Sequence, residues 1–145
     1  MMKKLLIGAS CIALCSLVSA KSSNEITNTN KTENFQREKI AKSFIIKTKK
    51  FKVRIDLQPN GKYLYQSWGA NTKITAKPSM IISNGTLIPD GSGGNYFFEF
   101  ENSGHTYQVW RNYITDNPRK APYTLIVLDR NNNTIVEQDA QIVKS

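Results

Sequence analysis

The sequence predicts an all-β fold, a single antiparallel β-sandwich or small barrel of about seven or eight short strands. Three observations indicate this fold. After position 50, apolar and polar residues alternate in several segments, as they do in strands that have one buried face. Turn-forming sequences separate these segments at short intervals, and no apolar repeat of helical spacing interrupts them. We place the all-β domain at residues 44–145.

The first twenty residues have the pattern of a cleaved secretory signal peptide, because Lys3 and Lys4 precede an uncharged apolar stretch. Small residues end this stretch, and we expect cleavage after Ala20. The stretch is shorter than the roughly twenty residues of a membrane-spanning helix, and no later segment is long and apolar enough to span. No transmembrane segment is therefore predicted after cleavage. We therefore expect a periplasmic or secreted bacterial protein. Residues 21–43 are predicted to be a polar disordered spacer, of which the last ten could form a short helix.

Both cysteines of the chain, Cys11 and Cys15, lie inside the predicted signal peptide. A lipoprotein is an alternative, but too few apolar residues precede Cys11, and Cys15 follows Leu14, which is too large for lipid attachment. After cleavage at Ala20, the mature chain would have no disulfide, thiol nucleophile or cysteine-based metal site. Its stability must then come from a hydrophobic core. The single histidine, His105, cannot build a histidine-based metal site. We predict no cofactor.

The clearest hairpin signal lies just after position 50. Residues 51–57 alternate between an apolar and a polar face, and a Pro-Asn-Gly turn at 59–61 leads into a second strand at 62–68. A turn at this place fixes the register of the hairpin. It sets Ile55 opposite Tyr65 on the core face.

Similar alternation predicts the later strands. Asn84-Gly85 is the strongest two-residue hairpin signal, and it predicts a turn between strands at 79–83 and 86–88. The glycine-rich segment 90–95 predicts a flexible hairpin loop, since a phosphate-binding loop would need a following helix and a calcium loop more carboxylates. Further strands are predicted at 95–101, 105–114, 121–129 and 134–143.

No residue pattern predicts catalysis, and we expect that the protein is not an enzyme. His105 has no nucleophile context around it, and a solvated turn residue is the simpler interpretation. Glu99 and Glu101 share one face of a strand. Glycosidase chemistry, however, needs acids that flank a cleft.

The charge of the mature chain points to anionic partners. Eighteen bases against eleven acids after Ala20 leave a net charge of +7. An acidic protein, an anionic glycan or a lipid head group would suit this charge. Nucleic acid would suit it too, but export argues against nucleic acid as a partner. An equally simple explanation is that the positive charge only keeps the protein soluble. Bases are densest between Arg37 and Arg54, where Lys49 and Lys50 precede the first predicted strand. These lysines indicate either an anion-binding strip or an edge strand protected against aggregation.

Two aromatic sites are candidate parts of a binding face. In the first hairpin, Trp68 is predicted opposite Lys52 and near Arg54, a combination that suits a sugar or an anionic group. The alternative is that Trp68 folds under a loop. In a later hairpin, Phe97 is predicted opposite Trp110 on the nominally polar face, where the alternative is packing under the loop that follows Trp68.

From Lys77 to Phe100 the chain resembles a group of small exported bacterial proteins with the core K-P-x-x-x-x-x-N-G … G-x-G-G-N-Y-x-F-x-F. That group has no assigned activity, so the resemblance implies only an exported β-rich protein. In size and β character the chain is also similar to periplasmic lysozyme inhibitors. Their paired cysteines and their Ser/Gly-rich inhibitory segment are not matched here, and this similarity implies an inhibitor by architecture alone.

The sequence therefore predicts an exported non-catalytic binding protein of the bacterial envelope, which engages a protein or envelope component through a basic and aromatic β face. The alternatives are a surface module that binds an anionic glycan or lipid, and a periplasmic inhibitor of a lytic enzyme. The candidate binding residues are Lys49, Lys50, Lys52, Arg54, Trp68, Phe97 and Trp110.

Overall fold

The structure, a computed structural model, describes residues 40–143. The predicted signal peptide at 1–20 lies outside the described residues, and so does the predicted spacer up to residue 39. In the described part of the chain, no helix is long and apolar enough to cross a membrane.

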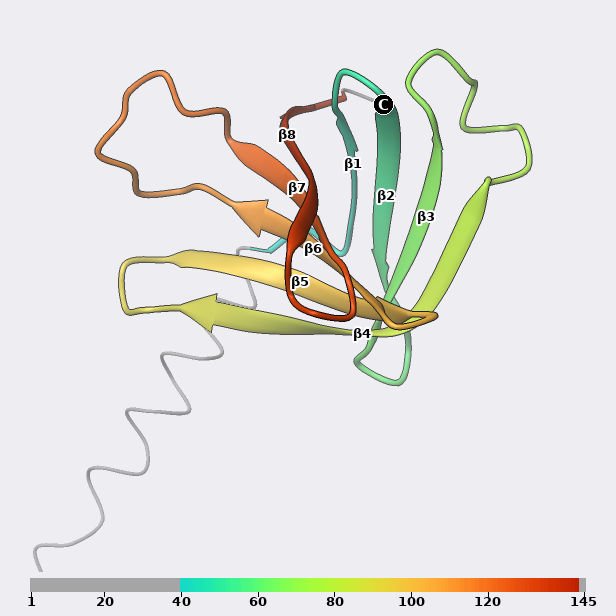
Figure 1. Cartoon of the computed structure of the whole chain (residues 1–145), viewed down its shortest axis with the longest axis horizontal. Coiled ribbons are helices and arrows are strands. Elements are labelled where there is room, and N and C mark those ends of the chain that lie inside the picture. Colours follow the sequence, from blue (N-terminus) through green and yellow to red (C-terminus); the bar gives the residue numbers. More distant parts are fainter. Residues whose placement is uncertain (1–39, 144–145) are drawn as a thin grey trace, which may run out of the picture. The chain divides into compact units, whose positions relative to one another are not determined.

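Eight antiparallel strands form a closed barrel in which each strand pairs with the next along the chain and the last pairs with the first (Figure 1). The predicted all-β fold is thus confirmed, in the form of a small barrel. The strands are β1 (Ser43–Lys47), β2 (Phe51–Leu57), β3 (Tyr63–Gly69), β4 (Met80–Asp90), β5 (Asn95–Asn102), β6 (His105–Arg111), β7 (Tyr123–Leu128) and β8 (Thr134–Ile142).

Strand β4 bends because it takes part in both halves of the barrel. Its first part pairs with β3 and its last part with β5, and Figure 1 shows the change of direction between them. Between the pairs Tyr63–Gly85 and Tyr65–Ile82, β4 contains one residue more than β3, and Asn84 has a φ of 62°. This is a β-bulge, which bends a strand. The predicted hairpin turn at Asn84-Gly85 is therefore wrong, because the positive φ that asparagine tolerates serves a bulge as well as a turn.

Side chains from all eight strands fill the inside of the barrel. An eight-stranded barrel is just wide enough for its own side chains to fill, and burial of their apolar surface is the main favourable contribution to folding. The largest fully buried side chains are Phe98, Phe100, Ile46, Ile55, Leu125, Val53 and Val109.

The predicted registers of the β2–β3 and β5–β6 hairpins are confirmed, whereas β1 was not predicted. Ile55 lies opposite Tyr65 in the β2–β3 ladder, and Phe97 lies opposite Trp110 in the β5–β6 ladder. Strand β1 has only five residues, and its adjacent Ile45 and Ile46 are both buried. A strand this short with two consecutive buried residues does not show the alternation by which strands are identified.

Candidate functional site

Six lysines gather at one end of the barrel, where the turn between β1 and β2 lies beside the loop between β3 and β4. Both are at the top of the view in Figure 1, and Ala70 N donates a hydrogen bond to Lys50 O at 2.9 Å. Segments 47–52 and 70–79 contain no acidic residue. We name this surface the basic end; it comprises Lys47, Lys49, Lys50, Lys52, Lys73 and Lys77.

The buried hydroxyl of Thr48 holds the backbone of the β1–β2 turn. Thr48 Oγ1 accepts hydrogen bonds from the backbone N–H groups of Lys50 (3.2 Å) and Phe51 (2.9 Å). The Oε1 atom of Gln138, on β8, lies 3.2 Å from Lys50 N and accepts a second bond from it. The turn backbone is thereby fixed, while the side chains of Lys49 and Lys50 remain exposed.

Trp68 and Lys52 fasten the β3–β4 loop to the barrel. Trp68 Nε1 donates to Ala76 O at 2.7 Å, and Lys52 Nζ donates to Thr72 O at 2.8 Å. Trp68 is only 3% exposed. Of the two interpretations of Trp68, the structure therefore shows the one in which the ring folds under a loop, and its faces are not available on the surface.

The positive charge of the basic end has no acidic partner within residues 40–143. Lys47 lies directly across from Lys52 in the β1–β2 ladder, and like charges at such positions destabilise a sheet. The exposed acids of the adjacent strand β8 are Glu137 and Asp139, and Asp139 pairs with Lys120 instead, at 3.8 Å. The lysines of the basic end therefore form no ion pair with any described residue.

Arg54 is neutralised by its neighbour and does not extend the basic end. Arg54 Nε lies 2.9 Å from Asp56 Oδ2, and Asp56 Oδ1 accepts a further hydrogen bond from Ser43 Oγ at 2.5 Å. This cluster links the outer faces of β1 and β2. Arg54 and Asp56 are both half-buried.

Phe97 and Trp110 form a stacked pair on the outside of the barrel. Their ring centroids are 4.2 Å apart, with 19° between the ring planes, and both residues are half-buried. Trp110 Nε1 donates to Gln108 Oε1 at 2.9 Å, and Gln108 Nε2 donates to Glu99 Oε2 at 2.8 Å. This pair belongs to the β5–β6 ladder and not to β1–β3. The structure therefore does not join the seven predicted residues into one basic and aromatic face.

The acids and the histidine considered for catalysis have local partners. Glu99 accepts from Gln108, and Glu101 Oε1 accepts from Thr106 Oγ1 at 2.7 Å. His105 Nδ1 lies 3.4 Å from Ser103 O. Within residues 40–143, no group of three or more His, Cys, Asp or Glu side chains could hold a metal ion.

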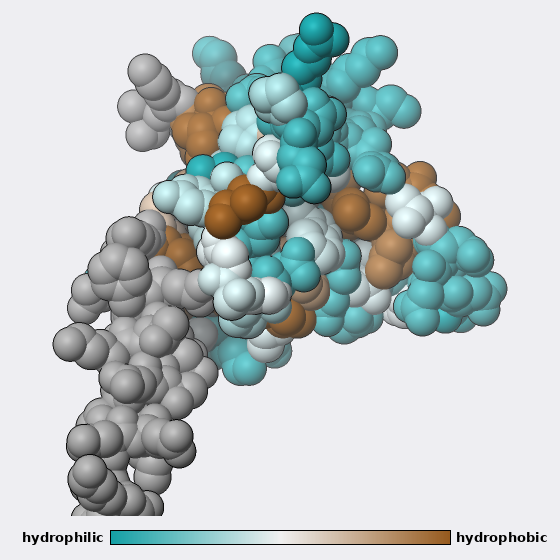
Figure 2. Space-filling model, turned by 90° about the vertical axis from the view of Figure 1, so that its left-hand side faces the viewer, coloured by the Kyte–Doolittle hydropathy of each residue, from teal (hydrophilic) through white to brown (hydrophobic). Residues whose placement is uncertain are grey.

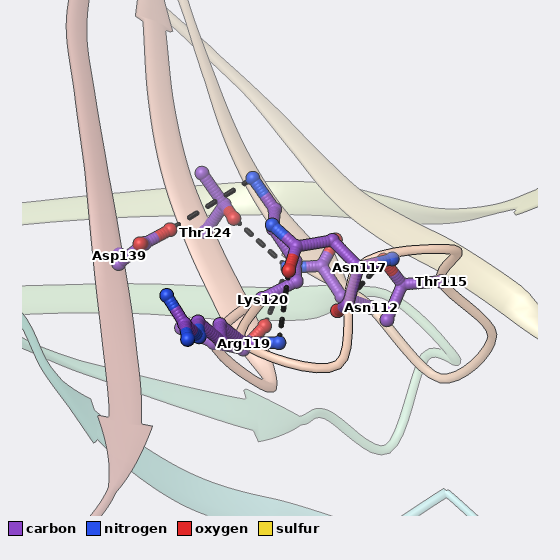
Figure 3. Close-up of polar contacts among 8 residues, drawn as sticks. Asn112, Thr115, Asn117, Arg119, Lys120, Thr124 and Asp139 are labelled. Atoms are coloured by element: carbon purple, nitrogen blue, oxygen red, sulfur yellow. Dashed lines mark hydrogen bonds and ion pairs between the residues drawn. The ribbon is translucent and has the colours of Figure 1, made fainter.

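Sequence reasoning did not identify the polar assembly in the β6–β7 loop, residues 112–122 (Figure 3). Asn112 Nδ2 donates to Ala121 O and to Thr124 Oγ1, both at 2.9 Å, and the figure shows Lys120 directed toward Asp139. The strand predicted at 105–114 is too long, because β6 ends at Arg111; the turn-forming Asp116, Asn117 and Pro118 that follow do indicate a loop. The tertiary partners that order it cannot be read from those residues alone.

Asn95 joins the β6–β7 loop to the β4–β5 hairpin. Its Oδ1 accepts from the backbone N–H groups of Tyr113 (2.8 Å) and Ile114 (2.7 Å), and its Nδ2 donates to Ile114 O at 2.8 Å. Both loops project to the left in Figure 1. Figure 2 shows that hydrophilic residues cover much of this side, with several separate apolar areas. Tyr113 and Ile114 are 65% and 55% exposed.

The comparisons with known proteins give no relative for this chain: no family model, no curated protein and no solved structure matches it. What can be said of its class comes from its own structure: it is a closed eight-stranded antiparallel barrel with the surfaces described above.

Proposed function

We propose that this protein is a non-catalytic binding protein that recognises a polyanionic partner of the bacterial envelope through its basic end. The observation that carries the proposal is the gathering of six lysines on one turn, on the strand ends that flank it and on one adjoining loop, with no ion-pair partner among the described residues. The export signal expected at residues 1–20 supports a partner in the envelope. Phe97 and Trp110 are not part of this proposal, because they lie on other strands.

The closed barrel weakens the simplest alternative explanation of the lysines. Lysines on a free edge strand prevent edge-to-edge aggregation. Strand β1, however, pairs with β2 on one side and with β8 on the other, so Lys47 is not on a free edge. The direct juxtaposition of Lys47 and Lys52 also costs stability that a bound anion would offset.

The side-chain chemistry favours a partner with many anionic groups. A lysine ammonium is a compact charge on a flexible stem, so it follows anions whose positions vary. A single small anion is usually held by the rigid fork of an arginine. The basic end therefore suits a surface or polymer with repeated phosphate or carboxylate groups.

Three probes would test the proposal and identify the class of partner: phosphatidylglycerol vesicles, polygalacturonate and polyglutamate. We expect the protein to bind at least one of them at low salt, with an affinity that falls steeply as salt is added, because exposed charges are screened. Binding that does not depend on salt, or no binding to any probe, would contradict the proposal.

Lys49 and Lys50 are the best positions at which to change the basic end. Neither side chain forms a hydrogen bond or ion pair with a described residue, so their replacement leaves the fold intact. Lys52 is a poorer choice, because its ammonium also holds the β3–β4 loop through Thr72 O.

A further inference from the structure

Arg111 places a positive charge at the mouth of the barrel opposite to the basic end. It is the last residue of β6, directly across from Tyr96 of β5 and Tyr123 of β7. Tyr123 belongs to the buried core cluster, and Tyr96 packs against it. Side chains directly opposite in a ladder share a face, so the Arg111 side chain lies on the inner face of the barrel.

The guanidinium of Arg111 contacts two aromatic rings and donates hydrogen bonds from one of its nitrogens. Its Cζ lies 5.0 Å from the ring centroid of Tyr123 and 5.6 Å from that of Tyr113. Arg111 Nη1 donates to Pro122 O at 3.0 Å and to Asn112 O at 3.5 Å. Both of these hydrogen bonds leave from Nη1, so the edge formed by Nε and Nη2 has no hydrogen-bond acceptor among the described residues.

No carboxylate compensates this charge within residues 40–143. The ion pairs there join Arg54 to Asp56 and Lys120 to Asp139. A half-buried charge without a counterion is costly, whereas an arginine stacked on aromatic rings is well placed to present its fork to an oxyanion.

Tyr96 supplies a second donor beside Arg111. Burial raises the pKa of Tyr96 to about 12; the nearby Tyr123 adds to the effect and the charge of Arg111 opposes it. The phenol keeps its proton at neutral pH, as a tyrosine of ordinary pKa also does, and can donate a hydrogen bond to an anion. The rigid attachment of Tyr113 to Asn95 positions this side of the mouth before any ligand binds.

We propose that Arg111 and Tyr96 form a binding site for a carboxylate or phosphate group at this mouth of the barrel. The oxyanion lies in the plane of the guanidinium and accepts from Nε and Nη2, while the Tyr96 hydroxyl donates to it. The site uses no residue of the basic end, so its test is independent of the test of the proposed function.

A nuclear magnetic resonance titration of the protein with inorganic phosphate and with acetate, at constant ionic strength, tests this site. We expect a saturable shift of the Arg111 Nε–H resonance with at least one of the two anions. Arg111→Lys has no Nε–H, so binding to it is followed by the shifts of the backbone amides of Tyr96 and Asn112 in both proteins; it should be weaker by about tenfold, since lysine cannot present a fork. The matched control, Arg119→Lys in the exposed part of the same loop, should change it by less than about twofold.

Tyr96→Phe is the second variant, because it leaves Arg111 and its contacts in place. We expect it to weaken anion binding several-fold while the rest of the spectrum stays that of the folded protein. Phosphatidylglycerol vesicles distinguish a phosphate on a lipid from a free one: competition between vesicles and free phosphate for the Arg111 signal supports a shared site. Shifts that do not saturate, or that are unchanged in Arg111→Lys, would overturn the proposal.

Discussion

The ring of Phe100 lies directly over Gly85, so that a Cβ built on Gly85 would overlap the ring. Gly85 follows the bulge of β4 at Asn84, and Phe100 is among the most buried side chains of the barrel. The glycine therefore lets a large core residue fill the bend at which β4 passes from one half of the barrel to the other. Glycine at a bulge is one of the ways in which a barrel turns a corner.

Gly85→Ala should destabilise the protein by about 1–3 kcal/mol, because the added methyl group overpacks the core. Chemical denaturation measures this loss. Phe100→Leu, which shortens the ring side chain, should cost less in the Gly85→Ala background than alone, with a coupling of roughly 0.5–3 kcal/mol. Strictly additive losses would show that the two residues do not compete for the same space.

The two tryptophans of the chain should differ in their access to solvent. Trp68 is 3% exposed beneath the β3–β4 loop, whereas Trp110 is half-buried on the outer face. We expect acrylamide to quench the fluorescence of Trp110, measured in Trp68→Phe, several-fold more efficiently than that of Trp68, measured in Trp110→Phe. Equal quenching in the two variants would mean that the loop does not cover Trp68.

Tyr65 should make the protein less stable at high pH. Burial, assisted by the nearby Tyr107 and opposed by a hydrogen bond with Ser67, raises the pKa of Tyr65 from 10.0 to about 12. Between these values the unfolded chain has lost a proton that the folded protein keeps, so stability that is present below pH 10 is lost as the pH rises toward 12. The expected loss is roughly 1.4 kcal/mol per pH unit over that interval.

Tyr65→Phe is the control for this pH dependence, because it removes the titrating hydroxyl and keeps the ring. Denaturation of both proteins across pH 9–12 should show the stability of the wild type falling relative to that of Tyr65→Phe as the pH rises from 10 toward 12. Parallel curves would show that Tyr65 titrates normally.

Asn95→Ala should loosen the β6–β7 loop, since three hydrogen bonds to Tyr113 and Ile114 are lost. Each hydrogen bond contributes about 1 kcal/mol, and the amides of both residues should exchange faster with solvent. Asn95→Asp is the matched control: it keeps both acceptor contacts and loses only the donor to Ile114 O. If both variants exchange alike, the acceptor contacts do not order the loop.

Alternation and turn chemistry were sufficient to predict the all-β fold and the register of two hairpins. The Pro59–Gly61 turn leaves one pairing for β2 and β3, and that pairing also sorts the apolar residues to one face. The turn predicted at Asn84-Gly85 was wrong because a bulge and a turn both accept a positive φ. Which of the two forms depends on the packing of Phe100, a residue of another strand.

The candidate site was harder to predict than the fold. The density of lysines near Lys49 is visible in the sequence, but Lys73 and Lys77 reach the same end because β3 and β4 pair next to β2, with the loop held by Trp68 and Lys52. Sequence pattern also placed Phe97 opposite Trp110 correctly. It could not show the order of the strands in the closed barrel, in which β5 and β6 are separated from β1 and β2 by other strands on both sides.

A comparison of two charge-matched variants tests the role of the basic end most directly. One carries Lys49→Glu with Lys50→Glu, and the other carries Lys42→Glu with Lys62→Glu. Both change the net charge equally, but Lys42 and Lys62 are exposed near the opposite ends of β1 and β3. For whichever of the three anionic probes binds, reversal at Lys49 and Lys50 should weaken binding by about tenfold and the control by less than about twofold. Equal losses in the two variants would show that only the overall charge matters, and would contradict a binding site at the basic end.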